Sequence, residues 1–270
     1  MEDKEQSAHI DELIPEVDVE KVFDHHFRCL VTGASDTGKS FFVTQVLFPH
    51  IQDKFDRVLI FTRSANVPYY EKNTKYFRAA QEKKTFATRF KEWFTGEKEP
   101  TDNFVRIITD LSEIPGELSN IPEEQEIVRE EKDGTPVYRY NYLIIFDDIL
   151  HEKLMKSQII TDLFTHFRHY SVSVFFIAQA SSYFIPSVVQ NNSSVLIITS
   201  MEDRDMRNSL LRHHVFTCIE SIDMSDEVVR SKARKAYKFA IEEKKMNGFP
   251  YGVLIVDKKH RRLFYFAERL

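Results

Sequence analysis

The sequence predicts an α/β protein with a mostly parallel central sheet that helices cover on both faces, and with antiparallel strands at its C-terminal end. The first observation is that short apolar runs alternate along the chain with segments of helical periodicity. The second is that these runs are continuously apolar, as expected for buried strands of a parallel sheet. The third is that the last two runs, 253–256 and 263–266, flank only the short basic segment 258–262.

In the first half of the chain, strands are expected at 27–32, 57–62 and 104–109. A helix is expected after the first strand, because Phe42, Val43, Val46 and Leu47 recur at i, i+4 spacing. Residues 71–94 have the composition of a basic helical region, which Gly96 and Pro100 close.

The second half of the chain continues the alternation. The segment 114–136 is acidic, and its turn pair Asp133-Gly134 predicts a protruding hairpin. Further strands are expected at 142–148, 172–178 and 195–199. A helix is expected after residue 148 with Met155, Ile159 and Leu163 on one face, then a short one from Pro186 and another at 202–213. A last helix is expected to be capped by Ser225 and ended by Gly248 and Pro250, and its apolar stripe is Val229, Ala233, Ala236 and Ala240.

A phosphate-binding motif follows the first strand. Residues 33–40 have the form G-x-x-x-x-G-K-S, in which the backbone N–H groups of a tight glycine loop face a nucleotide phosphate. Lys39 would reach the β- and γ-phosphates, and the Ser40 hydroxyl would bind Mg²⁺. A chance glycine loop is the alternative, but two of only seven glycines stand at the required positions. The predicted nucleotide-binding residues are Gly33, Ala34, Ser35, Asp36, Thr37, Gly38, Lys39 and Ser40.

Two carboxylates end the apolar strand at 142–148. Asp147 directly follows the apolar run and is the candidate Mg²⁺ ligand, whereas Asp148 is the candidate base that deprotonates the attacking water. Such strand ends are common in α/β proteins, but this one follows a phosphate-binding loop by about a hundred residues. The pair of acids favours hydrolysis over simple phosphate binding.

Gln179 and Arg168 complete the candidate catalytic set. Gln179 ends the next strand, so its amide could contact the γ-phosphate or the water, although it could equally be a polar residue at a strand exit. Arg168 is the first candidate for a positive charge that a neighbouring subunit supplies to the transition state, with Arg204 and Arg207 behind it. The alternative for Arg168 is an arginine that meets the dipole of a helix C-terminus.

Charge and composition limit the partners. The net charge of −5 argues against a protein that coats nucleic acid generally, but residues 1–24 and 113–133 hold seventeen acidic and four basic residues, so the remainder is mildly basic. Two basic groups could contact phosphates, a helix and a hairpin tip, and solvated faces are the alternative for both. Their residues are Arg230, Lys232, Arg234, Lys235 and Lys238 on the helix and Lys258, Lys259, His260, Arg261 and Arg262 at the tip.

Other classes of protein are not expected. The longest apolar runs are too short to span a bilayer, and the acidic start of the chain is unlike a signal peptide. The two cysteines, Cys29 and Cys218, do not indicate a disulfide framework, so we expect a reduced, intracellular protein. The histidines lack companion cysteines or an H-E-x-x-H pattern, so no zinc site is predicted.

The chain is expected to form one domain with additions. Residues 1–22 form an acidic flexible leader, and 23–270 form a P-loop ATPase domain. That domain carries an insert at about 71–136 and a C-terminal helix plus hairpin at 225–270.

Several segments together resemble one family, the poxvirus-type genome-packaging ATPases of large DNA viruses, virophages and Polinton-type elements, within the FtsK–HerA class. The resemblance covers about residues 25–215 and is carried by four segments: 33–40, 144–148, 167–179 and 185–192. The stretch from Phe167 into the strand that ends at Gln179 is its most specific part. Asp36 departs from the pattern, because the family usually has a small or neutral residue there.

The resemblance implies a RecA-like P-loop NTPase core and ATP hydrolysis, with Mg²⁺, coupled to translocation of double-stranded DNA into a preformed capsid. It assigns Lys39 and Ser40 to phosphate and Mg²⁺, Asp147 to the metal, Asp148 to the base and Gln179 to sensing. It also implies a homo-oligomeric ring, a pentamer or hexamer, that works with capsid vertex proteins in an infected host cell and not with a membrane. The alternatives are another P-loop ATPase such as a helicase, a nucleoside-phosphate kinase, or a nucleotide-binding structural protein of the capsid.

Overall fold

The computed structural model describes residues 14–24, 26–72, 105–130, 134, 136–149, 154, 156–179, 185–219, 225–243 and 252–266. Most of the predicted basic helical region 71–94 lies outside these ranges, as do Met155, Gly248 and Pro250. Within them, no helix combines the length and the apolar character that a bilayer span requires.

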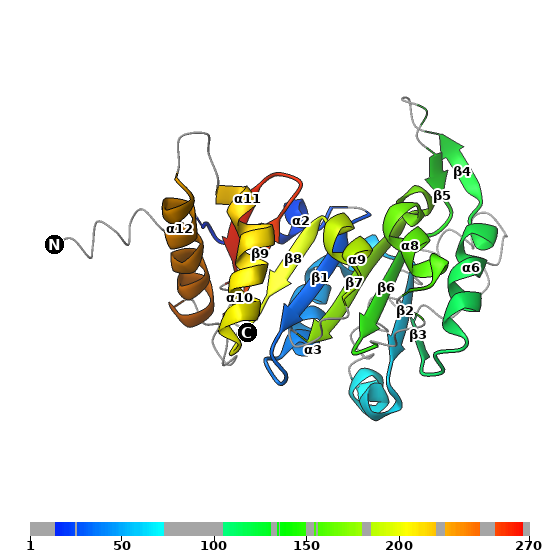
Figure 1. Cartoon of the computed structure of the whole chain (residues 1–270). Helices are drawn as coiled ribbons and strands as arrows, with labels where there is room; N and C mark the ends of the chain where they lie inside the picture. Colours follow the sequence, from blue (N-terminus) through cyan, green and yellow to red (C-terminus); the bar gives the residue numbers. More distant parts are fainter. Residues whose placement is uncertain are drawn as a thin grey trace.

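An eight-stranded sheet forms the centre of the described structure, in the order β10-β9-β8-β1-β7-β6-β2-β3 (Figure 1). Its strands are β1 (Arg28–Gly33), β2 (Arg57–Thr62), β3 (Val105–Ile108), β6 (Tyr142–Asp147), β7 (Val172–Gln179), β8 (Val195–Ile198), β9 (Leu254–Asp257) and β10 (Arg262–Tyr265). Strands β8 to β3 pair in parallel, whereas β9 and β10 pair antiparallel. The predicted mostly parallel sheet with antiparallel strands at the C-terminal end is confirmed.

Each face of the sheet buries its own set of side chains, because neighbouring residues of a strand point to opposite faces. Leu30 and Ile144 lie in the core that includes α6 (Ile114–Glu124), α8 (Gln158–Thr165) and α9 (Ser187–Asn192). Val31 and Ile145 lie in the core of the other face, which includes α2 (Val19–Val22) and the helical segment 39–51. Helices therefore cover both faces, as predicted.

The helical segment 39–51 consists of α3 (Lys39–Phe41), π-helical turns (Phe42–Leu47) and α4 (Phe48–Ile51). Its predicted apolar residues are all buried. A further helical stretch consists of α10 (Arg204–Leu210), a π-helical turn (Leu211–Val215) and α11 (Phe216–Ile219), so it runs six residues beyond the predicted end at 213. Next comes α12 (Asp226–Lys238). The predicted stripe is buried, with Val229, Ala233 and Ala236 in α12 and Ala240 in the π-helical turn Phe239–Glu243 that follows it.

The acidic segment 114–136 differs in part from its prediction. The hairpin is confirmed, since β4 (Ile127–Glu130) and β5 (Pro136–Tyr138) pair antiparallel as a small second sheet. A helix precedes it that the acidic composition concealed, because α6 buries only three apolar residues, Ile114, Leu118 and Ile121.

Two other predictions need correction. The predicted face of α8 is right in part: Leu163 is buried and Ile159 packs half-buried against the same core, but the buried face also includes Ile160 and Phe164, which the prediction left out. The expectation of a flexible leader is wrong for 14–22. Ile14 is fully buried, the backbone at 15–17 hydrogen-bonds to Tyr265, and α2 starts with Asp18 as its cap, so apolar packing outweighs the acidic charge there.

Both cysteines of the chain are free thiols. Cys29 is buried in β1, and Cys218 is partly buried in α11. Burial raises the pKa of the Cys29 thiol well above its ordinary value.

Candidate functional site

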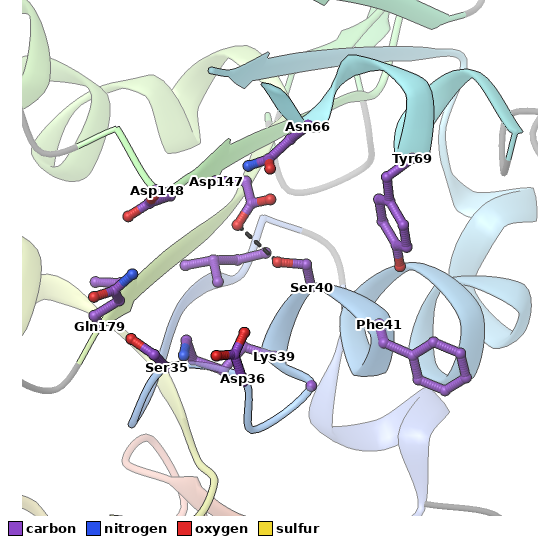
Figure 2. Close-up of a pocket in the computed structure, with 13 residues that line it drawn as sticks. Ser35, Asp36, Lys39, Ser40, Phe41, Asn66, Tyr69, Asp147, Asp148 and Gln179 are labelled. Carbon is purple, nitrogen blue, oxygen red and sulfur yellow. Dashed lines mark hydrogen bonds between the residues drawn. The ribbon is translucent and has the colours of Figure 1, made fainter. Parts of the chain in front are cut away.

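The carboxyl ends of β1, β2, β6 and β7 meet at one edge of the sheet, where ligands of open parallel sheets bind. A cavity of about 380 Å³ opens there, and Figure 2 shows Lys39, Ser40, Asp147, Asp148 and Gln179 around it. Residues that lie more than a hundred positions apart in the sequence are thus brought together as predicted.

The loop between β1 and α3 has the tight backbone that its glycines predict. Gly38 has φ 72°, a left-handed conformation that side chains disfavour. At Gly33 an added Cβ would lie 1.8 Å from Oγ1 of Thr199, so only glycine fits. Thr37 closes the loop by donating a 2.8 Å hydrogen bond to the carbonyl of Ala34, and its hydroxyl lies 2.7 Å from that of Thr199 at the end of β8.

Lys39 begins α3 and is almost fully buried. Its ammonium donates to the carbonyls of Gly33 and Ala34, so the cation lies inside the loop. Burial lowers the pKa of Lys39, and Asp147, Asp148 and Asp36 oppose that shift by favouring the charged form.

Asp147 is held from two sides at the end of β6. The hydroxyl of Ser40 donates to its Oδ1 at 2.8 Å, and the hydroxyl of Tyr70 donates to its Oδ2 at 2.8 Å. Burial raises the pKa of Asp147, while the hydrogen bonds from Ser40 and Tyr70 lower it. A carboxylate beside a hydroxyl is an oxygen donor set of the kind that Mg²⁺ prefers, so Ser40 and Asp147 fit this ion.

Tyr69 and Tyr70 were not predicted from the sequence. They lie in a helical turn at 67–72 that follows β2. The Tyr69 hydroxyl lies 2.6 Å from the hydroxyl of Thr44, which itself donates to the carbonyl of Ser40. Burial raises the pKa of Tyr70 well above its ordinary value, which keeps the phenol protonated as a donor. The two tyrosines therefore fix both the start of the phosphate-loop helix and the carboxylate opposite it.

Asp148 follows Asp147 in a left-handed conformation, with φ 56°. Its carboxylate is about one-third exposed and lies 3.7 Å from the guanidinium of Arg63, just beyond the end of β2. Arg63 was also missed in the sequence, where it is one of many arginines. Gln179 lies beside Gly33 in the strand register and lines the same cavity.

Asp36, the departure from the family pattern, is exposed at the mouth of the cavity with φ 58°. A left-handed conformation is more readily adopted by aspartate and asparagine than by most residues. Its carboxylate is near enough to Lys39 to act on the pKa of that lysine.

The candidate arginines do not join the cavity of their own chain. Arg168 lies in the turn Phe167–Tyr170 before β7, and therefore at the edge of the sheet opposite to Gln179. Arg204 and Arg207 lie on α10 and line a separate groove. The trans role of Arg168 stays a prediction.

The two basic groups differ in their surroundings. Arg230 and Arg234 line the same groove system as α10, whereas Lys232 and Lys235 do not. At the hairpin tip, Lys259, Arg261 and Arg262 are exposed. Lys258 is partly buried and donates a 2.7 Å hydrogen bond to the carbonyl of Gln190, so it is part of the packing rather than of a free surface.

A sequence family described as Poxvirus A32 protein matches residues 102–256, more than half of the chain. The matched range contains Asp147, Asp148 and Gln179 but not the phosphate loop. No curated protein matches.

Solved structures of viral packaging enzymes are similar in fold. The genome packaging NTPase B204 of Sulfolobus turreted icosahedral virus 2, in complex with ATP-gammaS, has 11% identity and a TM-score of 0.53, with 91% of this chain and 98% of that chain covered. Its complex with AMPPCP gives 12% identity and a TM-score of 0.52 over 90% and 98%. B204 of Sulfolobus Turreted Icosahedral Virus, described as the DNA-packaging ATPase, gives 12% identity and a TM-score of 0.50 over 90% and 98%. The chain therefore shares the fold of these packaging NTPases, in agreement with the predicted mostly parallel α/β core.

Proposed function

Because the chain belongs to the Poxvirus A32 protein family, we propose that it is a viral packaging ATPase that drives double-stranded DNA into a preformed capsid. The observation that carries this proposal is the 2.8 Å hydrogen bond between Ser40 and Asp147, which joins the phosphate loop to the acidic end of β6 inside one cavity. Nucleotide binding alone would not require a carboxylate pair at this point.

Mg²⁺ is the ion that this cavity suits. Ser40 and Asp147 would hold it, and Tyr70 would keep the Asp147 carboxylate turned toward it. When bound, the ion would neutralise charge on the β- and γ-phosphates of ATP.

The remaining residues act on ATP and water. The loop N–H groups and Lys39 bind the phosphates, since the buried ammonium is a strong partner for negative charge. Asp148 accepts the proton of the attacking water, and the guanidinium of Arg63, 3.7 Å away, helps to hold its carboxylate in place. The Gln179 amide orients that water or contacts the γ-phosphate, and its position at the end of β7 supports this role.

Arg168 completes the site of a neighbouring subunit in this proposal. Its turn lies at the amino end of β7, whereas the cavity lies at the carboxyl end of that strand. A guanidinium supplied in trans stabilises the charge of the transition state and couples subunits of a ring, here a homopentamer or homohexamer. The ring would operate at the vertex of the assembling capsid inside an infected host cell.

The test is ATP hydrolysis by the purified full-length chain with and without duplex DNA. Turnover should rise with duplex and fall to background in Lys39→Ala. Lys54→Ala is the matched control, because Lys54 also donates to backbone carbonyls, those of Glu20 and Phe23, but lies away from the cavity. If the rate of ATP hydrolysis were the same with and without duplex DNA and were unchanged in Lys39→Ala, the motor would be excluded. ATP binding without turnover would support a structural protein instead.

A further inference from the structure

A groove with two basic walls lies between α10 with its following turn and α12, which run side by side at one end of the sheet (Figure 1). One wall carries Arg204, Arg207 and Arg212, and the other carries Arg230, Arg234 and Lys238. Among the described residues, Glu242 is the one acidic residue that lines it. Within the described ranges, the groove shares no lining residue with the nucleotide cavity.

The charge of this groove is not balanced by the described part of the chain. Among the described residues, no ion pair joins any of the six cationic side chains to a carboxylate. Arg207 instead stacks over the ring of Tyr237, with its guanidinium carbon 5.6 Å from the ring centre. Six like charges along one groove repel one another, and a bound polyanion would remove that repulsion.

The spacing of the cations follows the helix period. Arg230, Arg234 and Lys238 recur every four residues, so they lie along one side of α12. Eight residues of helix span about 12 Å, a length over which one strand of B-form DNA presents about three to four phosphates. Lys235 lies next to Arg234 in sequence and is exposed, but it does not line the groove.

The other side chains of the groove suit backbone contacts rather than base reading. Asn208 and Ser209 offer hydrogen-bond donors, and Leu211 and Phe216 form apolar lining. Amide, hydroxyl and guanidinium groups bind phosphate oxygens without regard to sequence. A protein that moves along a whole genome requires binding of this kind.

We propose that the groove between α10 and α12 binds the sugar–phosphate backbone of duplex DNA, an identification that rests on the proposed function. The hairpin tip is the weaker candidate. Lys258 donates a hydrogen bond to the carbonyl of Gln190. Asp257 accepts a hydrogen bond from the backbone N–H of His260, and its other oxygen lies 2.6 Å from Nδ1 of the same residue, so the basic cluster at the tip contains a carboxylate. No such carboxylate pairs with the groove arginines among the described residues.

The experiment compares neighbouring charge reversals in the full-length chain. Arg234→Glu and Arg212→Glu alter opposite walls of the groove, and Lys235→Glu makes the same change of charge one residue outside it. Binding of a labelled duplex is measured at several salt concentrations, with thermal unfolding of each variant as the check on folding. The two groove variants should bind about tenfold or more weakly, with a salt slope smaller by about one ion, whereas Lys235→Glu should stay within about threefold of the unaltered chain.

Two results would overturn the proposal. Equal weakening by all three variants would mean that general charge, and not the groove, attracts DNA. Unchanged duplex binding in Arg234→Glu and Arg212→Glu would remove the groove as the DNA site, and a lower mass in solution for these variants would then identify it as a contact between copies of the chain. Lys39-dependent ATP hydrolysis by the unaltered chain tests the proposed ATPase separately, so the failure of one is distinguishable from the failure of the other.

Discussion

The hydroxyl of Tyr70 donates a hydrogen bond to Oδ2 of Asp147, 77 residues further along the chain, and both groups are buried. The other oxygen of the same carboxylate is held by Ser40. Hydrogen bonds of this kind fix the orientation of a ligand and tune its affinity for a metal. The segment after β2 is therefore part of the candidate Mg²⁺ site, where Tyr70 acts through Asp147.

Tyr70→Phe should weaken the affinity for Mg²⁺ rather than nucleotide binding itself. The ring stays and the hydroxyl is lost, so the Mg²⁺ concentration for half-maximal hydrolysis should rise about tenfold or more. Binding of a fluorescent nucleotide in the presence of EDTA should change little. Tyr69→Phe is the control, because Tyr69 bonds to Thr44 and not to Asp147. An unchanged Mg²⁺ titration in Tyr70→Phe would leave the tyrosine with a packing role only.

Asp148→Asn should separate binding from turnover. Asparagine keeps the shape of the side chain but cannot accept the proton of water, so the rate constant kcat should fall by a factor of about 10² to 10⁴ while nucleotide still binds. Single-turnover hydrolysis and nucleotide titration measure the two quantities. If Asp148→Asn turned over at an undiminished rate, another group would have to be the base.

Asp36→Asn should tighten nucleotide binding. The exposed carboxylate lies at the mouth of a cavity that receives phosphates, and asparagine tolerates the same left-handed backbone at φ 58°. Removal of one exposed like charge should lower the Kd of ATP about two- to fivefold, with the larger effect at low salt. Weaker binding in Asp36→Asn would indicate that the carboxylate contributes to the loop structure instead.

His214 should make the protein less stable in mild acid. Burial, together with the positive charges of Lys258 and His213, lowers the pKa of His214 to about 4 from 6.5. The unfolded chain therefore binds a proton between these pH values that the folded chain excludes. The contribution of His214 to the free energy of unfolding is complete above pH 6.5 and is lost as the pH falls toward 4. At pH 4.5 the loss is about 2.5 kcal/mol.

Denaturant unfolding at pH 7 and pH 4.5 measures this contribution. His214→Gln should lose less stability between the two pH values than the unaltered chain does. His213→Gln, at the exposed neighbour, should keep most of the pH dependence of the unaltered chain, because burial is the largest cause of the His214 shift. If the free energy of unfolding depended on pH identically in His214→Gln and His213→Gln, protonation of His214 would not be the cause of the loss of stability in acid.

The parts of the fold that could be predicted are those with a local signal. β1, β2, β6, β7 and β8 were predicted to within about one residue, because buried parallel strands are uninterrupted apolar runs. The residues at their carboxyl ends followed from the same rule, so the phosphate loop, Asp147, Asp148 and Gln179 were expected together before their geometry was known.

What could not be predicted depends on contacts between distant segments. Nothing around Tyr70 in the sequence distinguishes it from an ordinary core tyrosine. Arg63 is recognised as part of the site only because its guanidinium lies 3.7 Å from Asp148 in the structure. The two walls of the basic groove likewise come from different helices, and the sequence alone could not separate Arg234 from Lys235. Helix α6 was missed because three apolar residues are a weak signal within an acidic segment.

The segment after β8 contacts both the phosphate loop and a wall of the basic groove. Thr199 shares a hydrogen bond with Thr37 in the phosphate loop, and two residues later the N–H of Met201 donates to the hydroxyl of Tyr237 beneath Arg207. Two residues of backbone reach at most about 7 Å, so the two hydrogen bonds lie close together on one short segment. A displacement of Thr37 would therefore act first on a segment that also contacts a wall of the groove. The phosphate loop and the basic groove thus contact the same short stretch of backbone, residues 199–201.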